Sequence, residues 1–111
     1  MIVGLGDIYA RIPRREEVRQ LMRSTQASVR EQPGCILYAF AETLDDPGHF
    51  VLVQQWRDQA AVEQHYRSPE FAEYQEKIAA LLVRSSELRL HVVTEGVRPL
   101  DPSQPTTTQE D

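Results

Sequence analysis

Two apolar runs separated by a turn sequence dominate the middle of the chain. The runs cover residues 35–42 and 49–56, and the segment LDDPG at 44–48 lies between them. Its Asp, Pro and Gly residues favour the backbone angles of a chain reversal. The pattern therefore predicts a β-hairpin.

Both strands of this predicted hairpin are apolar on both faces. Successive side chains of a strand alternate between the two faces of a sheet. In the first strand, one face has Ile36, Tyr38 and Phe40, and the other has Cys35, Leu37, Ala39 and Ala41. In the second strand, one face has Phe50, Leu52 and Trp56, and the other has Val51 and Val53. A sheet with two apolar faces needs two covers, and a chain of this length has helices for one. We therefore expect a homodimer, with the second subunit on the other face.

Helical and strand patterns flank the hairpin. Apolar residues recur at helical spacing from Arg15 to the break at residues 33–34. Asp58 can cap a short helix over 58–67, and Ser68 precedes Pro69, which suits the first position of the next helix. The last helix has an inward stripe that consists of Phe71, Tyr74, Ile78, Leu81 and Leu82. Alternation over 2–11 and 87–95 predicts the first and fourth strands of the chain, with Leu88, Leu90 and Val92 on one face of the fourth.

The resulting element order is β-α-β-β-α-β. With short links and right-handed crossovers, it fits an α+β, ferredoxin-like fold in which the helices cover one face of an antiparallel sheet. We expect this domain to span residues 1–96. Residues 97–111 are rich in Pro and Thr and end in Glu110 and Asp111, so they are predicted to form a disordered, acidic C-terminal tail.

Composition narrows the classes of partner. The chain has 111 residues, of which 41% are hydrophobic, and a formal net charge of -5. One domain is expected, and its charge provides no general basic surface for nucleic acid or an anionic membrane. The first residues, MIVGLGD, contain no basic segment and reach Asp7 quickly, which is typical of neither a signal peptide nor a membrane span. We expect a cytoplasmic protein.

Metal and nucleotide sites are not expected. Cys35 is the only cysteine, which excludes an internal disulfide and a cysteine-rich zinc site, and its place at a strand start favours a small core residue. No two histidines have the i, i+4 spacing of a helical metal site. Gly4 and Gly6 lie inside a predicted strand and lack the third glycine of a phosphate loop.

His65 is the first candidate catalytic residue. Its helical phase, one turn after Ala61 and Val62, points it toward the sheet, so we expect a cleft between sheet and helices to contain it. Imidazole can accept or donate a proton near neutral pH. The alternative is a buried histidine that bonds to backbone at a helix junction.

Asp7 is the second candidate, because an acid inside an apolar strand must lie at an edge, be paired, or occupy a cavity. Aromatic side chains near the helix break could bind an aromatic ligand or its oxygen atoms. These candidate ligand contacts are Trp56, Tyr38, Tyr66, Phe71 and Tyr74. For Trp56, core packing is the alternative.

Several short motifs together resemble one known family. They are QPGC at 32–35, DDPG at 45–48, Trp56 at the end of the third strand, and HYRSPEF at 65–71. Their order and spacing over residues 2–95 resemble the antibiotic biosynthesis monooxygenase domain. The resemblance implies a dimeric α+β barrel, which agrees with the two apolar faces of the hairpin.

The resemblance also implies a range of activities. The family includes cofactor-free oxygenases that act on polycyclic phenols and quinone precursors, haem-degrading enzymes and small-molecule isomerases. Haem-degrading members have an Asn near the position of Asp7 and a haem-ligating His near that of Gln75, so no haem is expected here. The leading hypothesis is a cofactor-independent monooxygenase that uses O2 on a small aromatic phenol or quinone-type compound. A small-metabolite isomerase using His65 and Asp7, and a non-catalytic dimeric ligand-binding or stress-response protein, are the alternatives.

Overall fold

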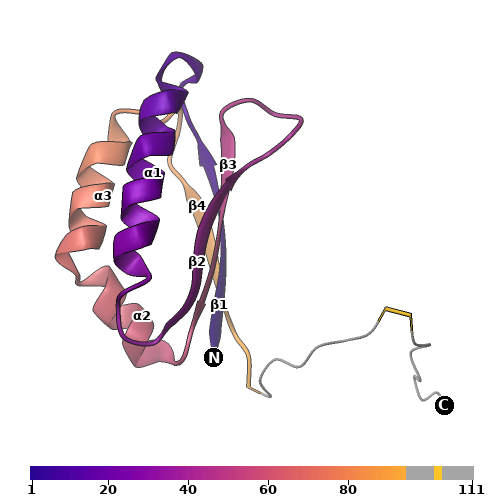
Figure 1. Cartoon of the computed structure of the whole chain (residues 1–111), viewed down its shortest axis with the longest axis vertical. Helices are drawn as coiled ribbons and strands as arrows, with labels where there is room; N and C mark the ends of the chain where they lie inside the picture. The colour runs from indigo at the N-terminus through magenta and orange to yellow at the C-terminus, as the bar shows by residue number, and fades with distance from the viewer. Residues whose placement is uncertain (95–101, 104–111) are drawn as a thin grey trace.

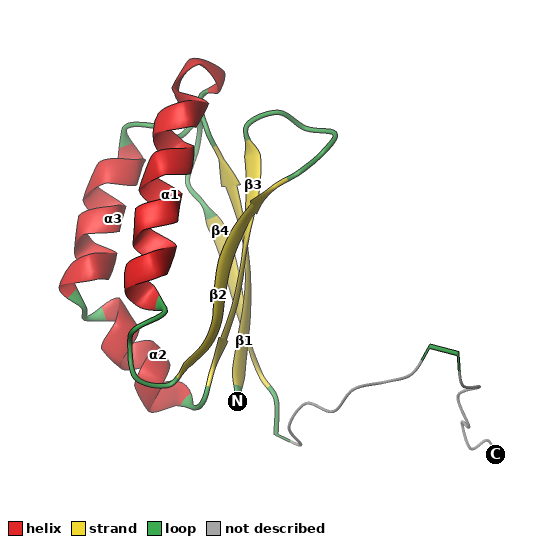
Figure 2. Cartoon of the chain, in the orientation of Figure 1, coloured by secondary structure: helices red, strands yellow, loops and turns green. Residues whose placement is uncertain are grey.

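A four-stranded antiparallel sheet with helices on one face forms the described part of the chain (Figures 1 and 2). The computed structural model describes residues 1–94 and 102–103. Its elements are β1 (Ile2–Tyr9), η1 (Ile12–Arg14), α1 (Arg15–Val29), β2 (Cys35–Glu42), β3 (His49–Trp56), α2 (Gln59–Tyr66), α3 (Pro69–Ala79) and β4 (Glu87–Val92). The expected domain boundary at residue 96 and nearly all of the predicted tail lie outside the described residues.

The sheet has the strand order β2-β3-β1-β4, and every neighbouring pair is antiparallel. The two central strands are therefore the first and third in the chain, with β2 and β4 at the edges. This arrangement confirms the predicted ferredoxin-like α+β fold. The helices cover the inner face of the sheet, and none of the helices in residues 1–94 lies over the opposite, outer face (Figure 1).

The predicted hairpin is confirmed at both strands, but the phase of its first residues was predicted wrongly. Cys35 pairs with Trp56 and Leu37 pairs with Gln55, so Ile36 is an extra residue at a β-bulge. The bulge leaves Ile36 54% exposed, whereas Cys35 packs against the core. Tyr38 and Phe40 still share one face, as expected, and that face packs against the core beneath the helices.

Strand β3 follows the predicted alternation closely. Phe50, Leu52 and Trp56 are buried beneath the helices. Gln54 shares this inner face and is also buried, because its Oε1 accepts a hydrogen bond from Nε1 of Trp56 at 2.7 Å. The side chains of Val51 and Val53 lie on the outer face and are half-buried.

Side-chain caps begin the two helices after the hairpin. Oδ1 of Asp58 accepts a hydrogen bond from the Ala61 amide at 2.9 Å, and Oγ of Ser68 accepts one from the Phe71 amide at 3.2 Å. These bonds satisfy backbone donors that a helix start leaves free. The caps therefore confirm the two helix starts that the sequence predicts.

The last helix and the first and last strands of the chain are shorter than expected. Helix α3 ends at Ala79, so Leu81 and Leu82 belong to the following connection rather than to the helical stripe. Strand β1 ends at Tyr9, and Ala10 contributes only an isolated bridge to Leu82. Leu81 is nevertheless buried, since this connection packs back against the sheet.

The edge strand β4 is the least covered strand. Leu88 and Leu90 pair with Gly6 and Gly4 and therefore lie on the inner face, as does Val92 opposite Ile2. Their common face was predicted correctly, but each of the three side chains is at least 42% exposed. A space therefore remains between this edge of the sheet and α3.

Candidate functional site

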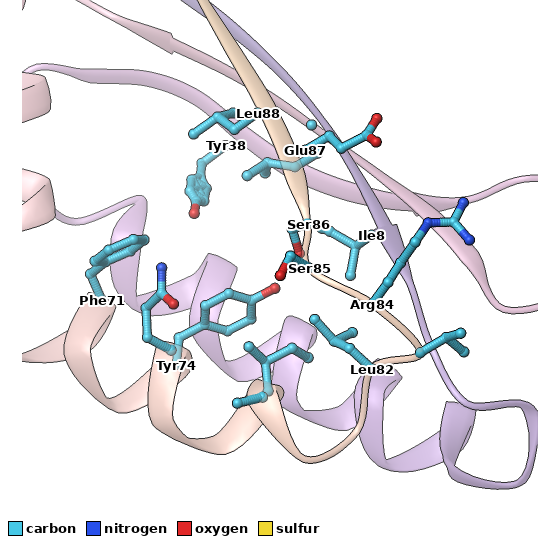
Figure 3. A pocket seen from close by; sticks show the side chains of 16 residues that line it. Ile8, Tyr38, Phe71, Tyr74, Leu82, Arg84, Ser85, Ser86, Glu87 and Leu88 are labelled. Atoms are coloured by element: carbon cyan, nitrogen blue, oxygen red, sulfur yellow. The ribbon is translucent and has the colours of Figure 1, made fainter.

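A cavity of about 520 Å³ occupies that space (Figure 3). Its floor is the inner face of the sheet at Gly6, Ile8 and Leu52. Helix α3 forms one wall, and the connection over residues 82–86 with the start of β4 forms the other. Most of the lining side chains are apolar or aromatic, as in a typical site for a small organic molecule.

Two tyrosines provide polar groups inside this apolar cavity. Tyr38 comes from β2 and Tyr74 from α3, and both are buried, but neither hydroxyl has a hydrogen-bond partner among the described residues. The two hydroxyls face the interior of the cavity (Figure 3). Burial raises the pKa of both phenols above the usual value, so both remain protonated at neutral pH. Each can donate a hydrogen bond to a ligand oxygen.

The rim of the cavity is polar. Ser85, Ser86 and Glu87 lie where the connection enters β4. Arg84 also lines the rim, but its guanidinium lies 3.7 Å from the ring centroid of Tyr9, in a cation–π contact. Figure 3 shows the end of this side chain directed away from the two tyrosine hydroxyls.

His65 lies behind the cavity rather than in it. Its side chain is 2% exposed and stacks on Trp56, with ring centroids 4.8 Å apart. Tyr38 and Phe71 contact it edge-on at 5.3 and 5.1 Å, and these same two rings line the cavity. The expectation that the cleft contains His65 was therefore wrong, because two aromatic rings separate the imidazole from the space.

The hydrogen bonds of His65 define its protonation state. Nδ1 lies 2.9 Å from Oε1 of Gln32, whose amide nitrogen donates to Ser68 at 3.1 Å and to Glu70 at 3.3 Å. The Gln32 oxygen must therefore accept, so Nδ1 carries the proton. Nε2 is buried without a partner in the described part of the chain, and burial lowers the pKa of His65 to about 4. The ring is neutral at pH 7 and bonds to a side chain rather than to backbone.

Trp56 and Tyr66 belong to the same aromatic cluster as His65. Trp56 is fully buried, which supports the core alternative, and Tyr66 lies with its ring centroid 5.3 Å from that of His65. The Tyr66 hydroxyl is buried and has no hydrogen-bond partner among the described residues. Neither residue lines the cavity. Of the five expected ligand contacts, the structure thus brings Tyr38, Phe71 and Tyr74 together at the cavity.

Asp7 lies on the outer face of the sheet, opposite the cavity. Its Oδ1 lies 2.8 Å from Nε2 of His49, and its Oδ2 lies 3.8 Å from the Arg89 guanidinium. It is therefore a paired acid, which was one of the three possibilities. Because the sheet separates Asp7 from His65, the two cannot form the proton-transfer pair that the isomerase hypothesis requires.

Sequence reasoning missed part of the cavity. Gly6 and the rim residues Arg84, Ser85 and Ser86 were not among the predicted site residues. The rim lies in a segment without apolar periodicity, so no pattern placed it beside α3. A signal for Gly6 did exist, since glycine weakens a strand interior and often marks a close approach by a ligand.

Two further findings limit the kinds of site. Within residues 1–94 and 102–103, no group of three or more His, Cys, Asp or Glu side chains could hold a metal ion. Over the same residues, no helix has the length and apolar character needed to cross a membrane.

Comparisons with known proteins agree with this fold. A family model described as antibiotic biosynthesis monooxygenase matches residues 1–77. An uncharacterized protein of Synechocystis sp. is 32% identical over 94 residues, which cover 85% of this chain. The same residues cover 64% of that protein, so this chain spans less than two thirds of its length. The candidate monooxygenase Rv0793 of Mycobacterium tuberculosis is 30% identical over 70 residues, covering 63% of this chain and 68% of that protein.

Solved structures show the same architecture. A candidate antibiotic biosynthesis monooxygenase from Deinococcus radiodurans matches with a TM-score of 0.83 and 24% identity, over 91% of this chain and all of that one. The structure of Rv0793 matches with a TM-score of 0.75 and 24% identity, over 93% of this chain and 98% of that one. At this level of identity the structural matches establish the fold.

Proposed function

Since this chain belongs to the antibiotic biosynthesis monooxygenase family, we propose that it is a cofactor-independent monooxygenase that acts on a planar aromatic phenol or quinone-type compound. The observation that carries the proposal is the pair of phenol hydroxyls, from Tyr38 and Tyr74, that lie inside a mainly apolar cavity and have no hydrogen-bond partner in the described part of the chain. Apolar walls suit fused aromatic rings, and the hydroxyls suit the oxygen atoms on such rings.

The proposed reaction draws its electrons from the substrate. A ring CH2 group flanked by aromatic rings loses a proton, and the resulting anion transfers an electron to O2. Recombination forms a carbon–oxygen bond, and loss of water from the peroxide leaves a C=O group. One oxygen atom enters the product and the other leaves as water. No separate reductant is needed.

The protein contributes hydrogen bonds and a dry environment to this reaction. Tyr38 and Tyr74 donate to the oxygen on which negative charge develops, in a site whose low polarity strengthens those bonds. The proton passes to solvent water at the rim of the cavity, beside Ser85 and Ser86. We assign His65 a role in packing, because its ring is enclosed and is a weak base.

A ligand-binding protein without turnover is the second candidate. The observation that favours it is the separation of His65 and Asp7 from the cavity, which leaves no imidazole among its described lining residues. The same separation weakens the isomerase hypothesis, which needs a proton-transfer pair beside the ligand.

Oxygen consumption tests the proposed function. We expect the protein to accelerate oxygen uptake by an anthrone or hydroquinone, and Tyr38→Phe or Tyr74→Phe to slow it roughly 10-fold or more, because each removes a bond to a charged oxygen worth about 1.5–3 kcal/mol. Tyr9→Phe is the matched control, since Tyr9 stacks on His49 outside the cavity. Oxygen uptake that is the same with and without protein, across a panel of such compounds, would exclude the monooxygenase.

We further propose that the outer face of the sheet forms a homodimer. Leu5 is 41% exposed there and pairs with the half-buried Val53, which in turn pairs with Ala39. Covering even ~300 Å² of apolar area per subunit would contribute roughly 7 kcal/mol at ~25 cal/mol/Å², before the costs of association. A second copy is a suitable cover, because it presents the same apolar face.

A further inference from the structure

Two glycines interrupt the inner face of strand β1. The residues on this face are Ile2, Gly4, Gly6 and Ile8, and both isoleucines are buried in the core. The backbone angles of Gly4 and Gly6 do not require glycine. In the described part of the chain, positive φ angles occur at Gly34 and Gly48 instead. Gly4 and Gly6 therefore each have another reason to lack a side chain.

For Gly4 the reason is packing. A Cβ atom built on Gly4 would lie 2.7 Å from Cγ of Gln54 and 2.8 Å from Cδ2 of Leu90. These side chains fill the space that a residue at position 4 would need. Gly4 is not part of the cavity lining.

For Gly6 the space is open to the cavity. A Cβ atom there would lie 3.3 Å from the Glu87 carbonyl oxygen, 3.5 Å from Leu88 and 3.7 Å from Leu52. The last two distances are ordinary van der Waals contacts, and the first requires a shift of a few tenths of an ångström. A methyl group at Gly6 therefore meets one tight backbone contact and two ordinary ones, and the position lies in the cavity floor.

We propose that Gly6 is a specificity-determining residue, whose missing side chain lets a fused-ring ligand lie flat against β1. Tyr74 and Ile78 of α3 line the cavity opposite this floor, so the ligand plane lies between the strand and the helix. A side chain at position 6 occupies the depth that the second and third rings need. This inference rests on the proposed function for the aromatic class of ligand, but it concerns binding and not oxidation.

Ligand size selectivity tests this assignment. The probes are 2-naphthol and 1,8-dihydroxyanthraquinone, titrated by calorimetry or fluorescence. We expect wild-type protein to bind both. Gly6→Val should weaken binding of the anthraquinone about 10-fold or more and change binding of the naphthol less than about threefold, since its methyl groups overlap the larger ligand. Gly6→Ala should give a smaller change in the same direction.

Gly4→Ala is the matched control on the same face of the same strand. It should lower the melting temperature without changing the ratio of the two affinities, whereas Gly6→Ala should lower the melting temperature less, because its closest contact is 3.3 Å rather than 2.7 Å. Equal loss of affinity for both probes in Gly6→Val, or no binding of either probe to wild-type protein, would overturn the proposal. Selective binding without oxygen uptake would contradict the monooxygenase and leave the role of Gly6 intact.

Discussion

The His65→Gln variant is expected to lose much of the acid sensitivity of the wild-type fold. Burial lowers the pKa of His65 from 6.5 to about 4, so the folded protein resists protonation that the unfolded chain accepts. Between these pH values the unfolded state binds more protons, and the free energy of unfolding falls as pH falls. Protonation of His65 in the unfolded chain lowers the free energy of unfolding by about 3 kcal/mol in total below pH 4, and this decrease is absent above pH 6.5. A glutamine side chain cannot be protonated, so the free energy of unfolding of the variant lacks this pH-dependent contribution.

Urea unfolding at several pH values measures the effect. The difference in unfolding free energy between wild-type and His65→Gln proteins should change by about 3 kcal/mol between pH 7 and pH 4, in favour of the variant at low pH. His91→Gln, at an exposed position on β4, is the control and should keep the wild-type slope. Parallel pH profiles for wild-type and His65→Gln proteins would show that the imidazole is not held neutral by burial.

The turnover rate of the His65→Gln variant distinguishes a packing role of His65 from a catalytic one. Because Tyr38 and Phe71 lie between His65 and the cavity, oxygen uptake at pH 7 should change only slightly once the fold is intact. A proton-transfer role would instead lower the rate by ~100-fold or more. Such a loss in a folded His65→Gln protein would return His65 to the catalytic machinery.

The Val53→Asp variant is expected to dissociate the proposed dimer. Val53 lies half-buried in the middle of the outer face, paired with Leu5 on one side and Ala39 on the other. In a monomer the new carboxylate remains hydrated, so the fold survives. In a symmetric dimer, two unpaired carboxylates lose water, which costs several kcal/mol and should raise the dissociation constant by at least ~100-fold.

Light scattering after size-exclusion chromatography measures this change. Wild-type protein at micromolar concentration should have the mass of two chains, and Val53→Asp that of one. Leu44→Asp makes the same chemical change at a fully exposed position in the hairpin turn and should remain dimeric. A monomeric wild-type protein would exclude the dimer, and a dimeric Val53→Asp would exclude the outer face as its interface.

Local signals explain why the hairpin could be predicted to the residue. Its strands are defined by alternation, and its turn by Pro47 and Gly48, so both depend on neighbours in the sequence. The bulge at Ile36 depends instead on pairing across the sheet with Trp56 and Gln55. No pattern within β2 alone could indicate which residue would be skipped.

The cavity was predictable where helical phase or strand alternation determined it. Tyr74 and Phe71 lie on the inward face of a clearly periodic helix, and both reach the cavity. The burial of His65 also followed from its phase. The depth at which His65 lies did not follow from its phase, because the packing of Tyr38 and Phe71 against the imidazole decides whether the ring reaches open space. The rim at Ser85 and Ser86 required the three-dimensional course of a non-periodic connection.

The most direct test of the account is a crystal structure of the protein soaked with 1,8-dihydroxyanthraquinone. The account predicts that the rings lie in the cavity against Gly6, with a ligand oxygen within hydrogen-bond distance of the Tyr38 or Tyr74 hydroxyl. A ligand bound elsewhere on the molecule, or bound in the cavity with both hydroxyls unpartnered, would contradict the claim that this space is the functional site.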